Sequence, residues 1–169
     1  TQCVMVHRSE LVEQMSLALA SAGIVHRIIA PSNIIAQIRT SHRREFNKSY
    51  VDATSRCSVV AVQTLVARRD ELAAWAATVD FWTMDEAHHV LVKNQWGTAV
   101  AMFTRAIGLG VTGTPQRLDG CGLGSHADGV FDMMVLGPDV RPLIDAGALC
   151  DYEILEIGRA SCRERVQIS

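Results

Sequence analysis

Asp85, Glu86 and His88 are the residues whose types and spacing point most directly to chemistry. They follow the apolar stretch Val79–Met84, which is expected to form a buried strand, and ligands of open parallel sheets bind at the carboxyl ends of strands. An Asp in this place can hold Mg²⁺, usually through water, because Mg²⁺ prefers hard oxygen ligands and keeps part of its hydration shell. The adjacent Glu can orient and deprotonate a water molecule that attacks a γ-phosphate. A strand-ending turn with two solvated acids is the simpler alternative for this string alone.

A second group of polar residues, Thr112, Gly113 and Thr114, directly follows the next predicted strand, Ile107–Val111. Two hydroxyl groups in this place would lie beside the same edge of the sheet as the acids. Small residues before a proline also make ordinary turns, so this string by itself does not distinguish a ligand-binding loop from a turn.

A third group lies at strand-to-helix junctions and could bind an anion. An arginine and the free N–H groups of a helix start can hold a backbone phosphate, although an ordinary helix cap explains the same residues. The group consists of His7, Arg8 and Ser9 after the first predicted strand, with Gln63 and Thr64 after a later one.

The elements that must position these groups alternate between short apolar runs and amphipathic stretches, which predicts an α/β fold with a mostly parallel sheet. The expected strands are Cys3–Val6, Ile24–Ala30, Cys57–Val62, Val79–Met84, Ile107–Val111 and Leu149–Leu155. The expected helices are Ser9–Ala22 with Ser9 as N-cap, Asn33–Arg44, Thr64–Ala77, Asn94–Ala106 and Pro138–Ala146, and Pro115–Gly129 is expected to be irregular.

The composition excludes several classes of protein. The 169 residues are 49% hydrophobic and carry a net charge of −2, which excludes a disordered chain and a basic nucleic-acid coat protein. No apolar run reaches the length of a membrane span, and no secretory signal opens the chain. Five scattered cysteines without a CxxC pair argue against a zinc site or a disulfide framework, so a cytoplasmic location without membrane contact is expected.

Taken in order, the strings resemble those of a superfamily 2 DExH helicase, in particular the DEAD/DEAH-box helicases of phages and bacteria that are related to type III restriction subunits. His7–Gln14 is similar to motif Ia of that family, Val60–Leu65 to its next DNA-contacting motif, Asp85–His89 to motif II (Walker B), and Gly110–Pro115 to motif III, with Gly113 where the family usually has Ala. Arg117–Gly124 and Val135–Pro138 also resemble strings of this subgroup, so the resemblance covers about Cys3 to Glu153.

The resemblance implies a RecA-like P-loop NTPase domain of an ATP-dependent helicase that uses ATP and Mg²⁺ and moves on, or unwinds, DNA in a bacterial or phage-infected cell. Asp85 would then help to position Mg²⁺, and Glu86 would be the catalytic base. The implied coupling residues are His88, Thr112, Gly113 and Thr114. The implied contacts to the DNA backbone, or to RNA, are His7, Arg8, Ser9, Gln63 and Thr64.

Two parts of that family's pattern are missing from the sequence. The first is the Gly-rich phosphate-binding loop that ends Gly-Lys-Thr and should precede motif Ia, and neither Lys48 nor Lys93 stands in a Gly-rich context. The second is the other RecA-like domain, which bears an arginine in its final motif. The expectation is therefore an incomplete domain over residues 1–156 that lacks the P-loop strand and does not turn over ATP by itself.

The last residues carry a different resemblance. Glu156–Val166 is similar to the translation of a short-read sequencing adapter, so 157–169 is expected to be a non-native tail, and a genuine basic segment is the alternative. Without this tail, 13 basic and 17 acidic residues remain, so any contact with DNA must be local.

Two other functions stay open at this point. One is an ATP-driven DNA translocase of a restriction system, which does not separate strands. The other is a non-catalytic nucleic-acid-binding module without a P-loop. A GxGKT-type string encoded upstream of Thr1 would favour the enzyme.

Overall fold

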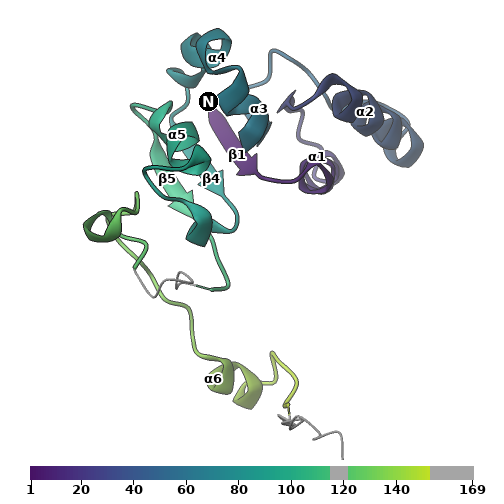
Figure 1. Ribbon diagram of the computed structural model, residues 1–169. Coiled ribbons are helices and arrows are strands. Elements are labelled where there is room, and N and C mark those ends of the chain that lie inside the picture. The colour runs from purple at the N-terminus through teal and green to yellow at the C-terminus, as the bar shows by residue number, and fades with distance from the viewer. Residues whose placement is uncertain (115–121, 153–169) are drawn as a thin grey trace, which may run out of the picture. The chain divides into compact units, whose positions relative to one another are not determined.

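A five-stranded parallel sheet is the centre of the structure, a computed structural model that describes residues 1–114 and 122–152 (Figure 1). The strands are β1 (Gln2–Val6), β2 (Arg27–Ile29), β3 (Cys57–Ala61), β4 (Phe81–Met84) and β5 (Ile107–Gly110), in the order β2-β3-β1-β4-β5. Every neighbouring pair is parallel, with Val4 beside Val59 of β3 and Thr83 of β4, for example. The predicted α/β class with a parallel sheet is confirmed.

Helices cover both faces of this sheet. Those of the first unit, Thr1–Met134, are α1 (Ser9–Ser21), α2 (Ser32–Phe46), α3 (Val62–Ala67), α4 (Arg69–Ala76) and α5 (Gln95–Ala101), with short 3₁₀ turns η1 (Ala87–His89) and η2 (Ser125–Ala127). A second unit, Val135–Ser169, has α6 (Val140–Asp145), where Arg141 pairs with Asp145 at 3.3 Å. Among the residues that the structure describes, no helix is long and apolar enough to cross a membrane.

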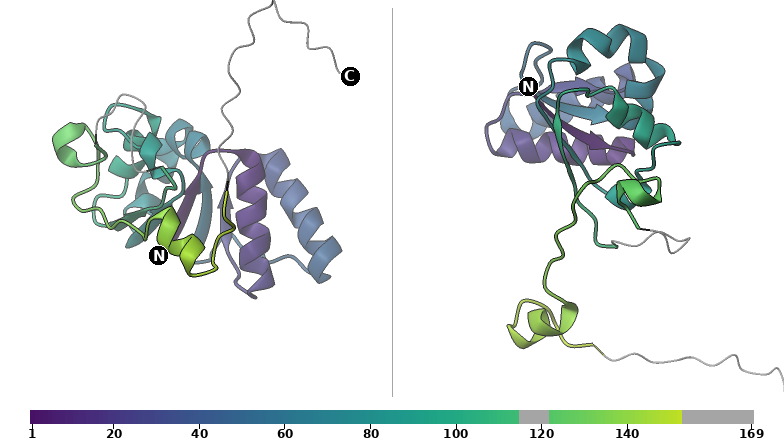
Figure 2. Two further views of the ribbon diagram at one scale, coloured as in Figure 1. Left: turned by 90° about the horizontal axis from the view of Figure 1, so that it is seen from below. Right: turned by 90° about the vertical axis from the view of Figure 1, so that its left-hand side faces the viewer.

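Two apolar cores lie on opposite faces of the sheet. On one face, α1 and α2 lie side by side (Figure 2, left) and bury Val12 and Ile38 against strand residues such as Val59. On the other face, α3, α4 and α5 cover strand residues such as Met5 and Met84. Alternate residues of β1, β2 and β3 therefore enter different cores, as a pleated strand requires.

The stretch Thr64–Ala77, expected to be one helix, forms two. The chain leaves helical geometry at Arg68 (φ −112°, ψ 27°), which ends α3 and begins α4. Leu65 and Leu72 lie on either side of this break and are both buried in the same core. The apolar spacing therefore continues across the break and does not reveal the change of direction.

Other boundaries also differ from expectation. β2 is only three residues long, because His26 makes one isolated bridge to Val51, while Ile24 and Val25 are exposed. The predicted N-cap at Ser9 is wrong, since Arg8 occupies that position and makes no side-chain capping bond in the described structure. The helix expected over Asn94–Ala106 ends at Ala101.

Several expectations fall wholly or partly on residues outside the described ranges, among them the resemblance of Arg117–Gly124, of which only 122–124 are described. For the strand at Leu149–Leu155, residues 149–152 are described and are not in a strand, and the rest lies outside. For Pro115–Gly129, residues 122–129 are described and contain η2. The proposed tail at 157–169 lies entirely outside.

Candidate functional site

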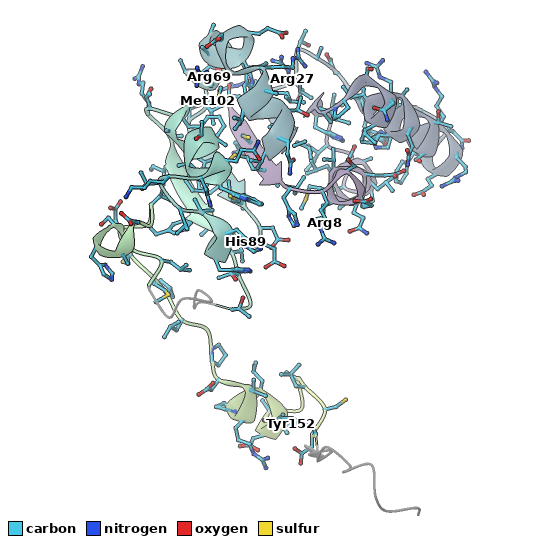
Figure 3. The ribbon with its side chains drawn as sticks, viewed as in Figure 1. Arg8, Arg27, Arg69, His89, Met102 and Tyr152 are labelled. Carbon is cyan, nitrogen blue, oxygen red and sulfur yellow. The ribbon has the colours of Figure 1, made fainter. Side chains whose placement is uncertain are left out.

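The polar groups predicted from sequence gather at one edge of the sheet. Because all five strands are parallel, their carboxyl ends meet at the same edge, where ligands of such sheets bind. Arg8 and His89, which follow β1 and β4, are labelled in Figure 3 at the end of the sheet toward which the β1 arrow points. The residues that follow the four carboxyl ends are His7, Arg8 and Ser9 (β1), Gln63 and Thr64 (β3), Asp85, Glu86 and His88 (β4), and Thr112, Gly113 and Thr114 (β5).

The acidic loop after β4 has an unusual backbone. Glu86 is in the left-handed region (φ 54°, ψ 45°), which residues other than glycine seldom occupy. Its N–H donates to Asp85 Oδ1 at 2.8 Å, and the next N–H, of Ala87, donates to the carbonyl of Val111 at 3.0 Å. The first bond holds the Asp85 carboxylate against the loop backbone, and the second ties the loop to the end of β5.

His88 connects the acidic loop to the hydroxyl groups after β5. Its Nδ1 lies 2.8 Å from Thr112 Oγ1 and 3.2 Å from Thr114 Oγ1, and it also lies 3.4 Å from a Glu86 carboxylate oxygen. The N–H of Thr114 donates in turn to Thr112 Oγ1 at 3.1 Å. One imidazole nitrogen is therefore shared between the carboxylate of one loop and the hydroxyls of the next, so displacing either loop alters both contacts.

The loop after β1 is held by the start of α3. Gln63 Nε2 donates to the backbone carbonyl of His7 at 2.7 Å, while the side chains of Arg8 and Ser9 are exposed at the start of α1. Thr64, the fifth residue of the predicted nucleic-acid contact, is half-buried in α3. An exposed guanidinium beside the free N–H groups of a 13-residue helix can bind a phosphate oxygen.

The structure also brings in residues that sequence reasoning missed. His89 stacks on the Trp96 indole with ring centroids 5.8 Å apart, and the His7 ring lies 5.4 Å from the same indole. Asn94 caps α5 by accepting from the N–H groups of Trp96 and Gly97, and its Nδ2 donates to the His89 carbonyl at 2.7 Å. The capping role of Asn94 had a sequence signal, since Asn precedes a helical stretch, but nothing in the spacing places His7 beside Trp96.

Partial burial and two neighbouring imidazoles act on His89. The pKa of His89 is lowered, mainly because burial disfavours the charged imidazole and also because His88 and His7 lie close by, while the Glu86 carboxylate opposes the shift. A neutral His89 is therefore favoured near neutral pH.

The donor set fits a water-mediated magnesium ion better than a directly liganded metal. Asp85 is exposed, and one of its oxygens accepts the Glu86 N–H, which leaves the other for a hydrated cation. Within residues 1–114 and 122–152, no three His, Cys, Asp or Glu side chains converge on a metal-binding point.

The lysines do not fit a phosphate-binding role. Lys48 Nζ lies 4.6 Å above the Tyr50 ring, and Lys93 lies 3.8 Å from Asp128. Both amines are therefore engaged elsewhere, and the chain contains no Gly-Lys-Thr loop. The site as described has the acids for a metal and a water molecule but no cradle for the phosphates.

A family model described as the type III restriction enzyme, res subunit, matches residues 2–117. The chain belongs to this family. The match covers the sheet from β1 to β5 and identifies the first unit as a RecA-like domain of a superfamily 2 helicase. No curated protein matches the chain.

Membership of the res-subunit family indicates ATPase activity of the helicase type in general terms. Its RecA-like domain is a helicase-family ATPase domain, which uses a nucleotide and a divalent metal and generally binds nucleic acid. The match ends at residue 117, so the resemblance of Val135–Pro138 to strings of the same subgroup stays a prediction.

Proposed function

We propose that this chain is the part of an ATP-dependent DNA motor that contacts the DNA backbone and supplies the acids for ATP hydrolysis. The observation that carries the proposal is the shared edge of the sheet: Arg8, Gln63, Glu86 and Thr112 follow the carboxyl ends of four parallel strands. In this proposal, Asp85 helps to position Mg²⁺, and Glu86 orients the attacking water and takes its proton.

The hydrogen bonds at His88 suit a coupling role. Because its Nδ1 contacts Thr112, Thr114 and Glu86, a change around the nucleotide phosphates at Glu86 would move the β5 loop. The groups proposed to hold DNA are the Arg8 guanidinium, the exposed start of α1 and the neighbouring Gln63 and Thr64. All of these would contact phosphate, so we expect binding without preference for base sequence.

The missing phosphate loop is proposed to come from polypeptide outside this sequence. β5 is the last strand of the described sheet, and its Ile107 and Leu109 are 74% and 51% exposed. An unpaired strand edge next to an uncovered apolar face is suited to a further parallel strand and its helix.

The first test concerns ATP. Purified Thr1–Ser169 should show no DNA-stimulated phosphate release, because phosphoryl transfer depends on the groups that position and neutralise the phosphates, and these are absent. Glu86→Gln is the matched control. Release that exceeds background in the parent chain and disappears in this variant would contradict the proposed division of roles.

The second test concerns the DNA backbone. Arg8→Ala should weaken binding of a labelled oligonucleotide equally for unrelated sequences, and should reduce the salt slope of log K by about 1, as loss of one phosphate contact predicts. Arg43→Ala is the control, because Arg43 is an exposed arginine in the last turn of α2, at the far end from the site. If the two variants lower the DNA affinity equally in fluorescence anisotropy, the proposed role of Arg8 is contradicted.

A second candidate function is supported by the family match itself. The matched family is described as the res subunit of a type III restriction enzyme, which favours ATP-driven translocation without strand separation. A strand-displacement assay beside a translocation assay on the complete protein distinguishes the two.

A further inference from the structure

Four aromatic rings connect the loop after β1 with the acidic loop after β4. The ring centroids of His7 and Trp96 lie 5.4 Å apart, those of Trp96 and His89 5.8 Å, and those of His89 and His88 4.1 Å. His7 and His89 also approach each other directly, at 6.3 Å. The contacts are therefore continuous from His7, which precedes Arg8, to His88, which contacts Thr112.

The His7 ring packs against aromatic neighbours, and one of its nitrogens is unbonded among the described residues. Its Nδ1 is buried and has no hydrogen-bond partner in the described structure. A buried polar atom without a partner is costly, and such an atom in a native protein calls for an explanation. The ring contacts of His7 with Trp96 and His89 are therefore the route by which we expect a displacement at Arg8 to reach its neighbours.

Trp96 and His89 are joined to each other by more than stacking. Asn94 accepts from the N–H of Trp96 at 2.9 Å and donates to the carbonyl of His89 at 2.7 Å, so both residues are attached to the first turn of α5. His89 then lies against His88, whose Nδ1 contacts Glu86 and Thr112. A shift at Trp96 is therefore expected to reach the imidazole that is shared by the two loops.

We propose that His7, Trp96 and His89 are positioning residues that transmit occupation of the DNA-backbone site at Arg8 to His88 and Glu86. This inference rests on the proposed function, because it takes the Arg8 loop as the place where phosphate binds. It assigns a role to His89 and Trp96, and it changes the role of His7 from a direct contact to a transmitting one.

The experiment follows the histidine side chains by NMR during titration of the whole chain with an oligo-dT strand. In the parent chain, the imidazole signals of His88 and His89 should shift as the strand binds. In Trp96→Leu, the His88 shift should be lost, while the affinity measured by anisotropy stays within about twofold, because Trp96 is not among the residues proposed to contact the strand. Trp96→Phe keeps an aromatic ring and should restore the shift.

Controls separate transmission from general damage to the fold. Trp75→Leu makes the same substitution in α4, where the indole contacts Phe103 and none of the three histidines, and should leave the His88 shift intact. His89→Ala removes an exposed side chain and should remove the His88 shift without unfolding the protein, which far-UV circular dichroism checks.

The outcomes distinguish this inference from the proposed function. If the oligonucleotide binds and the His88 signal shifts equally in the parent and in Trp96→Leu, the transmitting role alone is overturned. The same holds if the oligonucleotide binds and the His88 signal does not shift. A strand that does not bind, or that binds Arg8→Ala as well as the parent, overturns the proposed DNA contact and this inference with it.

Discussion

Glu86 combines the proposed catalytic carboxylate with a backbone conformation that favours glycine. Its φ of 54° places it in the left-handed region, where an L-residue costs about 1–2 kcal/mol. Such strain persists where the surrounding contacts determine the conformation, and it is common at functional sites. Here the contacts are the bonds from Glu86 N–H to Asp85 and from Ala87 N–H to Val111.

This conformation predicts that glycine at position 86 stabilises the protein. Glu86→Gly relieves the backbone strain but also raises the conformational entropy of the unfolded chain, which offsets part of the gain. The free energy of unfolding should rise by about 0.5–1 kcal/mol, which corresponds to a Tm increase of roughly 2 °C. Thermal unfolding by circular dichroism measures it. Glu10→Gly in the first turn of α1 is the control and should lower Tm, since glycine is unfavourable in a helix. A lower Tm for Glu86→Gly would show that the carboxylate contacts outweigh the strain.

At the scale of elements, a buried polar network joins α1, the start of β2 and α2. Ser16 Oγ lies 2.6 Å from His26 Nε2 and 3.1 Å from His42 Nε2, and all three side chains are fully buried. The other ring nitrogens are also bonded: His26 Nδ1 to the carbonyl of Ile24, and His42 Nδ1 to the N–H of Tyr50. Because His42 Nδ1 accepts the Tyr50 N–H, His42 is neutral and its Nε2–H donates to Ser16. His26 Nδ1 donates to the Ile24 carbonyl, and since burial lowers the pKa of His26, its neutral form is favoured, with Nε2 accepting from the Ser16 hydroxyl.

The network predicts that stability falls in mild acid. Burial lowers the pKa of both His26 and His42, against the opposing effect of the hydrogen bonds to Ile24 and Ser16. For His42, protonation of His26 would lower the pKa further, while Glu45 and Glu13 oppose the shift. Above pH 6.5 both rings are neutral whether the chain is folded or unfolded, so this stability is fully present. As the pH falls below 6.5, the unfolded chain takes up protons that the folded chain does not, and stability is lost.

Thermal unfolding between pH 7.5 and 5 tests this expectation. Each unit of pKa shift corresponds to about 1.4 kcal/mol of unfolding free energy, so Tm of the parent chain should fall by several degrees over this range. Tm should fall less in His42→Gln, which removes one titrating group. His126→Gln is the control, because His126 is exposed and lies outside this network. An equal pH dependence of all three proteins would assign the acid sensitivity to other groups.

At the scale of the whole sheet, the described residues of Thr1–Met134 leave uncovered the face of β5 that lies on the side of α1 and α2. Ile107 and Leu109 are exposed on this face, whereas Gly108 and Gly110 face the opposite core, where a Cβ would overlap the rings of Trp82 and Phe131. α1 and α2 cover β1, β2 and β3 only. An apolar strand face next to an unpaired edge favours association between copies.

We therefore expect Thr1–Ser169 to self-associate at micromolar concentrations. Leu109→Lys places a charge on the uncovered face and should shift the sedimentation profile toward monomer without changing the far-UV spectrum. Val92→Lys is the matched control, because Val92 is also about half exposed, at 55%, but lies outside the sheet. If both variants reduce association equally, net charge and not the β5 face is responsible.

The sequence by itself determined the α/β class, the order of the five strands along the chain and the groups that follow them. Strand-ending polar strings such as those at Asp85 and Thr112 are local features, and parallel strands necessarily bring their carboxyl ends to one edge. Arg8, Gln63, Glu86 and Thr112 could therefore be placed at one edge from the sequence alone. Helix ends were predicted less well, since a break such as that at Arg68 leaves the apolar spacing unchanged.

Only the tertiary structure decided which side chains touch. The contacts of His7 with Trp96, of Gln63 with the His7 carbonyl, and of Ser16 with two histidines join residues 10 to 89 positions apart. Such contacts depend on strand order and on the rotation of each helix about its axis, and neither quantity is encoded in local spacing. The left-handed backbone of Glu86 was also decided by the tertiary structure, because a glutamate adopts this conformation when bonds from neighbouring segments hold it there.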